Sequence, residues 1–202
     1  GECKVVRLAG KRDIKNIKKM FPEVMVIGIT KPKVIPSNYK ELTGDKSAMD
    51  AIICFKTADG KDGFIAIETK YSENLGTNVA SDNEKSLEII KQIKCFNTDV
   101  EAKIKSKQLK LTQIYRNFLL SESYGLWSNA DPYSIILSPK IHPSTEKEVR
   151  SITDEMQPGY KGKLLSISLE FFTDKLISES PEEYAEIFRR FRDRYLSFDR
   201  VE

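Results

Sequence analysis

The sequence predicts an α/β fold in which a central mixed β-sheet is flanked by helices. Apolar residues recur at helical spacing in some segments and at strand spacing in others, and the two kinds of segment alternate along the chain. A hairpin signal between residues 49 and 71 adds two antiparallel strands. The 202 residues suit one domain, with a core over about residues 11–140 and a C-terminal strand and helices over 141–202.

The N-terminal part predicts a helix followed by strands. KRDIKNIKKMF, residues 11–21, has apolar residues at helical intervals and lysines between them. PEVMVIGIT contains a short β-branched run that predicts a strand over residues 24–29. Residues 49–55 and 64–71 are apolar and β-prone, and TADGKDG between them is rich in turn residues. We therefore expect an antiparallel hairpin here.

The remainder alternates helices with strands. ENLGTNVASDN predicts a loop, and NTDVEAKIKSK, residues 97–107, predicts a polar connection. In LTQIYRNFLLSESYG the apolar residues share one helical face, and Gly125 is expected to end the helix. The other expected elements are helices over 84–96, 144–156 and 181–196, and strands over 133–138 and 163–172.

Composition excludes several classes of protein. The chain is 40% hydrophobic and 31% charged, and no apolar run reaches the roughly 20 residues that cross a bilayer, so we expect no membrane partner. Its three cysteines show no CxxC pairing, which argues against a disulfide framework or zinc site and favours a reducing cytoplasm. A net charge of +3 permits a polyanionic partner without requiring one.

Residue counting also limits the chemistry. The chain has one histidine, His142, which sits beside prolines, so Ser/His/Asp triads and histidine-rich metal sites are disfavoured. No GxxxxGK[ST] loop is present, and no GxGxxG follows a strand, so we expect no nucleotide cofactor. Any chemistry must therefore come from carboxylates and lysines, with or without a metal ion.

Two charged residues interrupt the otherwise apolar second strand of the hairpin. In FIAIETKY, residues 64–71, alternation puts Glu68 and Lys70 on the same face. Asp50 lies opposite one of them if the connection has odd length and is centred near Asp59 or Gly60, whereas a two-residue Asp59-Gly60 turn would send it to the other face. The odd-length connection predicts that the three charged groups meet.

Two carboxylates in this arrangement suit a hard divalent cation. Mg²⁺ takes oxygen ligands at about 2.0–2.1 Å and keeps several waters. Asp50, Glu68 and the backbone carbonyl of Thr69 could supply protein oxygens, and Mn²⁺ is an alternative ion. Lys70 would orient the attacking water or offset charge on a phosphate. The alternative is a solvated charge pair, which contributes only about 0–1 kcal/mol to stability.

Two stretches resemble a known family. KSAMDAIICFKTADGKDGFIAIETKYSE, followed by QIYRNFLLSES on a helix, is similar to the PD-(D/E)XK nuclease superfamily, most of all to a bacterial branch with the restriction-endonuclease-like fold. The resemblance covers residues 46–125 and implies a core of the order αβββαβ. Met49 stands where the motif that names the family has proline.

The resemblance implies roles for individual residues. Asp50 and Glu68 would be metal ligands, Lys70 the catalytic lysine, and Gln113 a helix residue that faces the site. Some members of the family add an acid from the first helix. Glu41 is a candidate for that role, as is Glu23, with a solvated carboxylate as the alternative for each.

Polar residues elsewhere are weaker candidates for contact with nucleic acid. Gln113, Arg116 and Asn117 share one helical face, which is either an exposed polar face or a surface that contacts phosphate or the metal site. The arginines at 189, 190, 192 and 194 could contact a DNA backbone, but acids share their helix.

The leading hypothesis is a Mg²⁺-dependent endonuclease that cleaves DNA, in restriction, defence or repair. The runner-up is a non-catalytic nucleic-acid-binding or regulatory module on the same fold, and a third is a partner-binding domain in which the charges have no catalytic role. Cuts in two antiparallel strands are most simply made by a two-fold homodimer, so a dimer is a further expectation.

Overall fold

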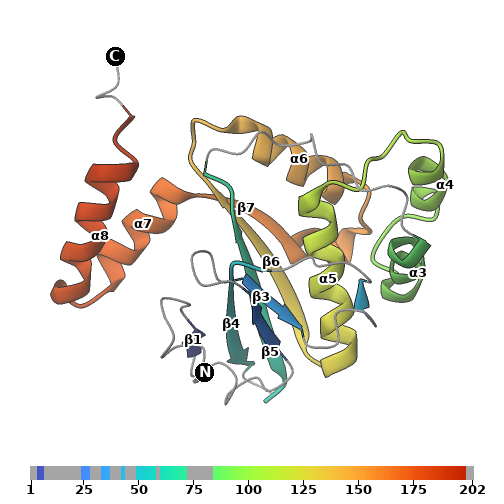
Figure 1. Ribbon diagram of the computed structural model, residues 1–202, viewed down its shortest axis with the longest axis horizontal. Coiled ribbons are helices and arrows are strands. Elements are labelled where there is room, and N and C mark those ends of the chain that lie inside the picture. Colours follow the sequence, from blue (N-terminus) through green and yellow to red (C-terminus); the bar gives the residue numbers. More distant parts are fainter. Residues whose placement is uncertain are drawn as a thin grey trace.

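The computed structural model describes residues 4–6, 24–27, 33–36, 42–43, 49–57, 60–71 and 84–198, the first three of these ranges as backbone only. Figure 1 shows the ribbon. The helices are α3 (Glu84–Ile93), α4 (Val100–Lys105), α5 (Gln113–Ser128), α6 (Pro143–Asp154), the 3₁₀ helix η1 (Pro158–Lys163), α7 (Leu169–Glu179) and α8 (Glu182–Tyr195). The strands are β1 (Lys4–Val6), β2 (Val24–Ile27), β3 (Lys33–Pro36), β4 (Ala51–Lys56), β5 (Asp62–Thr69), β6 (Asp131–Ser138) and β7 (Leu164–Ser168).

A mixed five-stranded sheet, in the order β1-β4-β5-β6-β7, forms the centre of the fold. β5 pairs antiparallel with β4 and parallel with β6, and β7 continues the parallel part. The α/β class with a mixed sheet flanked by helices, predicted from the sequence, is confirmed. The strand predicted at 24–29 is present as β2, but it pairs with β3 in a separate two-stranded sheet.

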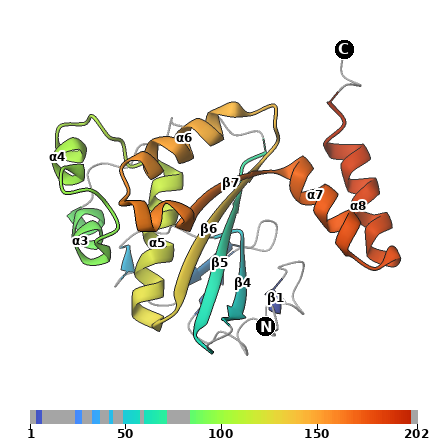
Figure 2. The ribbon, with the colours of Figure 1, turned by 180° about the vertical axis from the view of Figure 1, so that it is seen from behind.

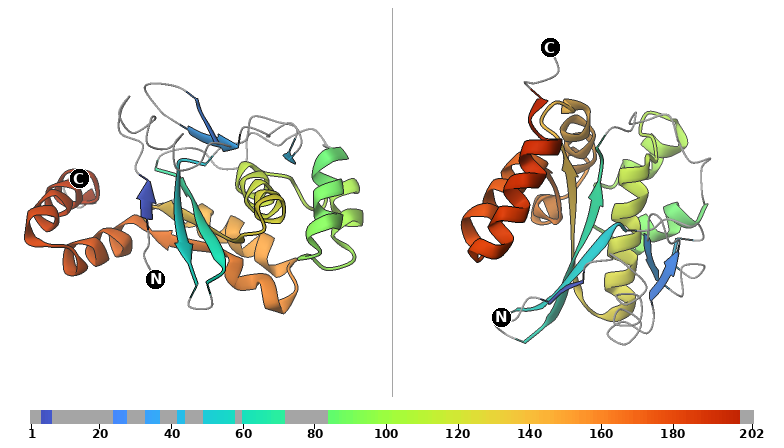
Figure 3. Two further views of the ribbon diagram at one scale, coloured as in Figure 1. Left: turned by 90° about the horizontal axis from the view of Figure 1, so that it is seen from below. Right: turned by 60° about the vertical axis from the view of Figure 1, so that its left-hand side comes forward.

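α5 lies on one face of the sheet, with α3 and α4 outside it, and α7 and α8 lie on the opposite side (Figures 2 and 3). α5 is therefore enclosed from several directions. The apolar stripe predicted for this helix forms its buried centre: Leu111, Ile114, Tyr115, Phe118 and Leu119 are each at most 2% exposed. Phe96 stacks on Tyr115 with 5.2 Å between ring centroids, which joins the end of the α3 segment to α5.

Two predictions between residues 97 and 129 are wrong. The polar connection at 97–107 contains α4, whose Val100 and Ile104 are buried. α5 does not end at Gly125 but continues to Ser128, where Asn129 takes the left-handed conformation. Gly125 instead permits close packing, since a Cβ there would lie 2.7 Å from Cγ of Pro132.

The apolar run LEFF does not extend the last strand. β7 ends at Ser168, whose hydroxyl accepts a hydrogen bond from the Phe171 N–H at 3.2 Å, and α7 begins at Leu169. A serine cap of this kind starts a helix even where the following residues are β-prone. The other C-terminal elements match their predictions within a few residues, with α6 starting at Pro143 behind His142.

The helix predicted over 11–21 and the loop predicted over 73–83 lie outside the described residues. Of the helices that the structure does describe, none combines the length and apolar character that crossing a bilayer demands.

Candidate active site

The β4–β5 hairpin has the odd-length connection that the sequence hypothesis required. Its register pairs Ala51 with Ile67 and Lys56 with Asp62, so the centre falls at residue 59. The connection is closed by hydrogen bonds from the Thr57 N–H to the Lys61 carbonyl and from the Gly60 N–H to the Thr57 carbonyl, both 2.9 Å. Gly60 has a φ of +83°, a conformation that glycine adopts without steric penalty.

Glu68 and Lys70 are in direct contact at the end of β5. The Lys70 ammonium lies 2.9 Å from Oε1 of Glu68. Their side chains are only 3% and 4% exposed, for Lys70 and Glu68 respectively, so this is a buried ion pair. The Lys70 N–H donates to the Leu137 carbonyl of β6 at 2.7 Å, which fixes the backbone from which the ammonium projects.

Asp50 is held against the same strand end. Its N–H donates to the Ile67 carbonyl at 3.0 Å. Its carboxylate accepts the Thr69 N–H at 2.8 Å, between the two residues of the ion pair. Asp50 is half-buried, so its carboxylate is the most solvent-accessible of the three charged groups. The exposed side chain of Thr69 lies on the opposite face of the strand.

The start of α5 contributes a further contact. Gln113, the first residue of the helix, donates from Nε2 to Oε1 of Glu68 at 3.1 Å. The preceding Thr112 caps α5 by accepting the Tyr115 N–H at 3.3 Å. One oxygen of Glu68 thus faces both the Lys70 ammonium and the Gln113 amide, and the helix start sets the orientation of the carboxylate.

Glu148 of α6 is a neighbour that the sequence did not single out. Its carboxylate accepts a hydrogen bond from the Thr112 hydroxyl and interacts electrostatically with the Lys70 ammonium. Burial raises the pKa of the Glu148 carboxyl above its ordinary value, and the Thr112 hydroxyl and Lys70 oppose that rise. No local sequence pattern marked Glu148, because the placement of α6 against α5 is a tertiary feature.

Other predicted residues are placed differently. Arg116 is half-buried, and Asn117 is 6% exposed, so the exposed polar face expected for this part of α5 is not present at Asn117. Glu41 and Glu23 lie outside the described residues. On α8, Arg189, Arg190 and Arg192 form ion pairs with Glu182, Glu186 and Asp174.

The cluster lies at a strand end of a mixed sheet that a buried helix covers, and a comparison with protein families gives a consistent result. The profile of the PD-(D/E)XK nuclease superfamily matches residues 9–197. The chain belongs to this superfamily. Searches among curated proteins and among solved structures found no match. Membership in the PD-(D/E)XK nucleases indicates a phosphodiesterase class of enzyme and a nucleic acid as its substrate.

The donors at the site fit the hard divalent cation that PD-(D/E)XK nucleases typically use. The carboxylates of Asp50 and Glu68 and the peptide carbonyl of Thr69 are all oxygen donors, the kind of group that such a cation prefers. In the described part of the chain no three Asp, Glu, His or Cys side chains gather to form a complete cage. A cation held by two protein carboxylates would keep several waters, as Mg²⁺ does, and this is the coordination that leaves room for a phosphate.

Proposed function

We propose that this protein is a Mg²⁺-dependent endonuclease that hydrolyses phosphodiester bonds of DNA, in restriction, defence or repair. The observation that carries the proposal is the meeting of Asp50, Glu68 and Lys70 at one strand end of a chain in a nuclease superfamily. Mn²⁺ would serve as an alternative ion, because it also accepts carboxylate and carbonyl oxygens.

Each side chain has a defined part in this proposal. Asp50 and Glu68, with the Thr69 carbonyl, would hold the cation, which when bound polarises a phosphoryl oxygen and lowers the pKa of water. Gln113 orients Glu68 through the hydrogen bond of 3.1 Å. Lys70 places a fixed positive charge beside the ligand carboxylate, where it would stabilise negative charge developing on the phosphate.

The direction of approach follows from burial. Lys70 and Glu68 are nearly inaccessible, whereas Asp50 is half-buried. A phosphate would therefore approach from the side of Asp50, and Lys70 would reach it only after its pair with Glu68 loosens. Binding of a cation by Glu68 favours that loosening, because the cation then compensates the negative charge of the Glu68 carboxylate in place of Lys70.

The same burial favours a second candidate function, a non-catalytic nucleic-acid-binding or regulatory module. In such a module the Glu68–Lys70 pair would be structural, and no opening toward a phosphate would be needed. The two functions differ in metal dependence, since a binding module requires no divalent ion at Asp50.

A cleavage assay separates these functions. The purified chain would be incubated with duplex, branched and single-stranded DNA, with Mg²⁺, with Mn²⁺ and with chelator, beside the variants Asp50→Asn and Lys70→Met. Asp62→Asn, an exposed acid at the start of β5, is the matched control. We expect metal-dependent cleavage that both site variants reduce at least about 100-fold, as for loss of a transition-state contact, and that the control keeps. Intact DNA under every condition, with binding retained, would favour the module instead.

A further inference from the structure

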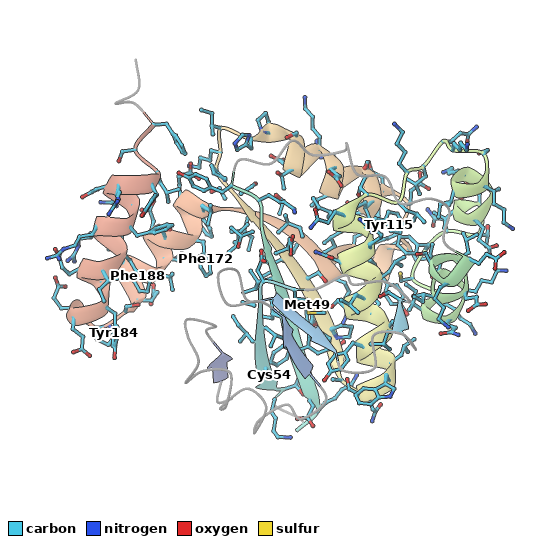
Figure 4. The ribbon with its side chains drawn as sticks, viewed as in Figure 1. Met49, Cys54, Tyr115, Phe172, Tyr184 and Phe188 are labelled. Carbon is cyan, nitrogen blue, oxygen red and sulfur yellow. The ribbon has the colours of Figure 1, made fainter. Side chains whose placement is uncertain are left out.

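The C-terminal helix α8 carries an apolar stripe that no residue in the described part of the chain covers. Tyr184, Ile187, Phe191 and Tyr195 recur at the spacing of one helical face and are 52%, 55%, 37% and 44% exposed. Large side chains exposed together in this way mark an interaction surface more often than isolated ones do. Tyr184 lies at the end of the helix that points away from the sheet, at the margin of the molecule (Figure 4).

The stripe is separate from the face that α8 uses within its own chain. Ala185 and the C-cap residue Leu196 are buried at 1% and 7% exposure, and Leu196 packs in one cluster with Ile67, Leu137 and Leu169. α8 as a whole is in contact with α7. Within the stripe, the rings of Phe191 and Tyr195 are in contact at 5.2 Å. The side chains are thus partly ordered before any partner arrives, which lowers the entropy lost on docking.

The charges of α8 indicate what the partner is. Its acids Glu182, Glu183 and Glu186 lie in the first half, and its arginines lie in the second half, at 189, 190, 192 and 194. With Asp193 the helix has four acids and four arginines, so its net charge is zero. A neutral helix is not drawn to DNA or to an anionic membrane surface, both of which require excess positive charge.

We propose that α8 pairs antiparallel with α8 of a second copy of this chain, about a two-fold axis near residue 189. In that pairing Ile187 packs on the partner's Phe191, and Tyr184 packs near the partner's Tyr195. The acidic half of each helix faces the basic half of the other, and the two helix dipoles are opposed.

Two charged residues of α8, Glu183 and Arg194, are available for ion pairs across the proposed α8–α8 contact. Within the described residues, Glu182 and Glu186 form ion pairs with Arg189 and Arg190, whereas Glu183 and Arg194 form none with each other or with any further side chain. Arg194 lies over the Tyr195 ring at 5.2 Å, at the end of the stripe. The antiparallel arrangement puts Glu183 beside the partner's Arg194, and the two-fold axis repeats that contact.

The interface is small, so association depends on concentration. Aromatic side chains bury about 150–250 Å² when covered completely. Four side chains with about half of that surface exposed supply roughly 350 Å² per protomer, and the flanking charged side chains bring this toward the roughly 600 Å² per partner of the smallest specific interfaces. We expect a dissociation constant in the micromolar range.

The dimer would also fix two sites relative to each other. The hydroxyl of Tyr71, the residue after Lys70, donates to the Tyr195 carbonyl at the end of α8. The helical rise over the twelve residues between the two Tyr195 positions, with the distance between helix axes, separates them by roughly 20 Å. This consequence bears on the proposed function, but the association itself does not rest on it.

Sedimentation velocity of the full chain, without metal or DNA, tests the proposal from about 1 µM to about 1 mM. The variants Glu183→Arg and Arg194→Glu each place like charges together at both symmetric contacts, so each alone should associate about tenfold more weakly. An equimolar mixture of the two variants should recover association, because every altered charge then faces its opposite. Ile187→Asp should abolish association, and Lys147→Glu on α6 should leave it unchanged.

Circular dichroism and thermal melting of each variant show that the variants remain folded. A chain that stays monomeric throughout the range, or a dimer that all the α8 variants leave intact, would overturn the proposal. So would a mixture that associates no better than the single variants. Retention on anionic vesicles that Ile187→Asp removes would assign the stripe to a membrane and would also overturn it.

Discussion

The Glu68–Lys70 pair allows a quantitative test of the site. Because the pair is buried, removing one partner should lower the free energy of unfolding far more than removing both. Lys70→Met keeps the length of the side chain but leaves the Glu68 carboxylate without its ammonium, at 4% exposure. Breaking a buried pair on one side costs about 3–5 kcal/mol in the free energy of unfolding. Glu68→Gln together with Lys70→Met removes both charges and keeps an amide for Gln113, so most of that loss should be recovered.

The assay is urea unfolding in the presence of chelator, for the wild type, both single variants and the double variant. We expect a coupling free energy of about 3 kcal/mol between positions 68 and 70. The matched control is the Lys56–Asp62 pair in the same hairpin, which is 2.6 Å long with side chains 64% and 67% exposed. Its coupling should stay below about 1 kcal/mol. A coupling at 68 and 70 no larger than that of the control would refute the inference that the pair is buried and interdependent.

Two further predictions concern α5. Burial raises the pKa of the Glu122 carboxyl to about 7, with Asp131 adding to the rise and Lys163 opposing it. Because the folded pKa lies above the unfolded one, the stabilisation by the bound proton is complete below about pH 4.5 and is lost as the pH rises through about 7. Glu122→Gln should therefore be more stable than the wild type at pH 8, by at most about 3 kcal/mol, with the difference shrinking toward pH 5 in urea unfolding. An equal difference at both pH values would contradict this cause. Gly125→Ala should destabilise the chain by about 1–3 kcal/mol although alanine favours helices, because the added Cβ meets Pro132. Gly159→Ala, where a Cβ would meet nothing within 4 Å, is the control in the same thermal melts, and equal melting of the two variants would count against the packing role of Gly125.

Local sequence patterns predicted much of the hairpin and little of its surroundings. The alternation in FIAIETKY is a property of one strand, so it predicted that Glu68 and Lys70 share a face. The parity of the connection, on which the position of Asp50 depends, was left open by the sequence and follows from the observed register. The hydrogen bond from the Thr69 N–H to the Asp50 carboxylate, by contrast, depends on local backbone detail at the start of β4.

The polar residues of α5 show where such patterns fail. Asn117 was expected either on an exposed polar face or in contact with phosphate or the metal site, yet it is only 6% exposed. The polar Ser121 and Glu122 further along are buried as well, because the helix lies between the sheet and other helices. The contact of Glu148 with Thr112 likewise depends on how α6 packs against α5. The start of α7 could have been predicted from Ser168, because a capping serine before Leu169 competes with the β-propensity of the apolar run that follows.

The central claim is that Asp50 and Glu68 share one divalent cation, and Mn²⁺ titration followed by electron paramagnetic resonance tests it most directly. We expect one bound ion per chain in the wild type, an affinity at least about tenfold lower in Asp50→Asn and in Glu68→Gln, and wild-type binding in Asp62→Asn. Binding that Asp50→Asn and Glu68→Gln leave unchanged, or no bound ion in the wild type, would contradict the claim.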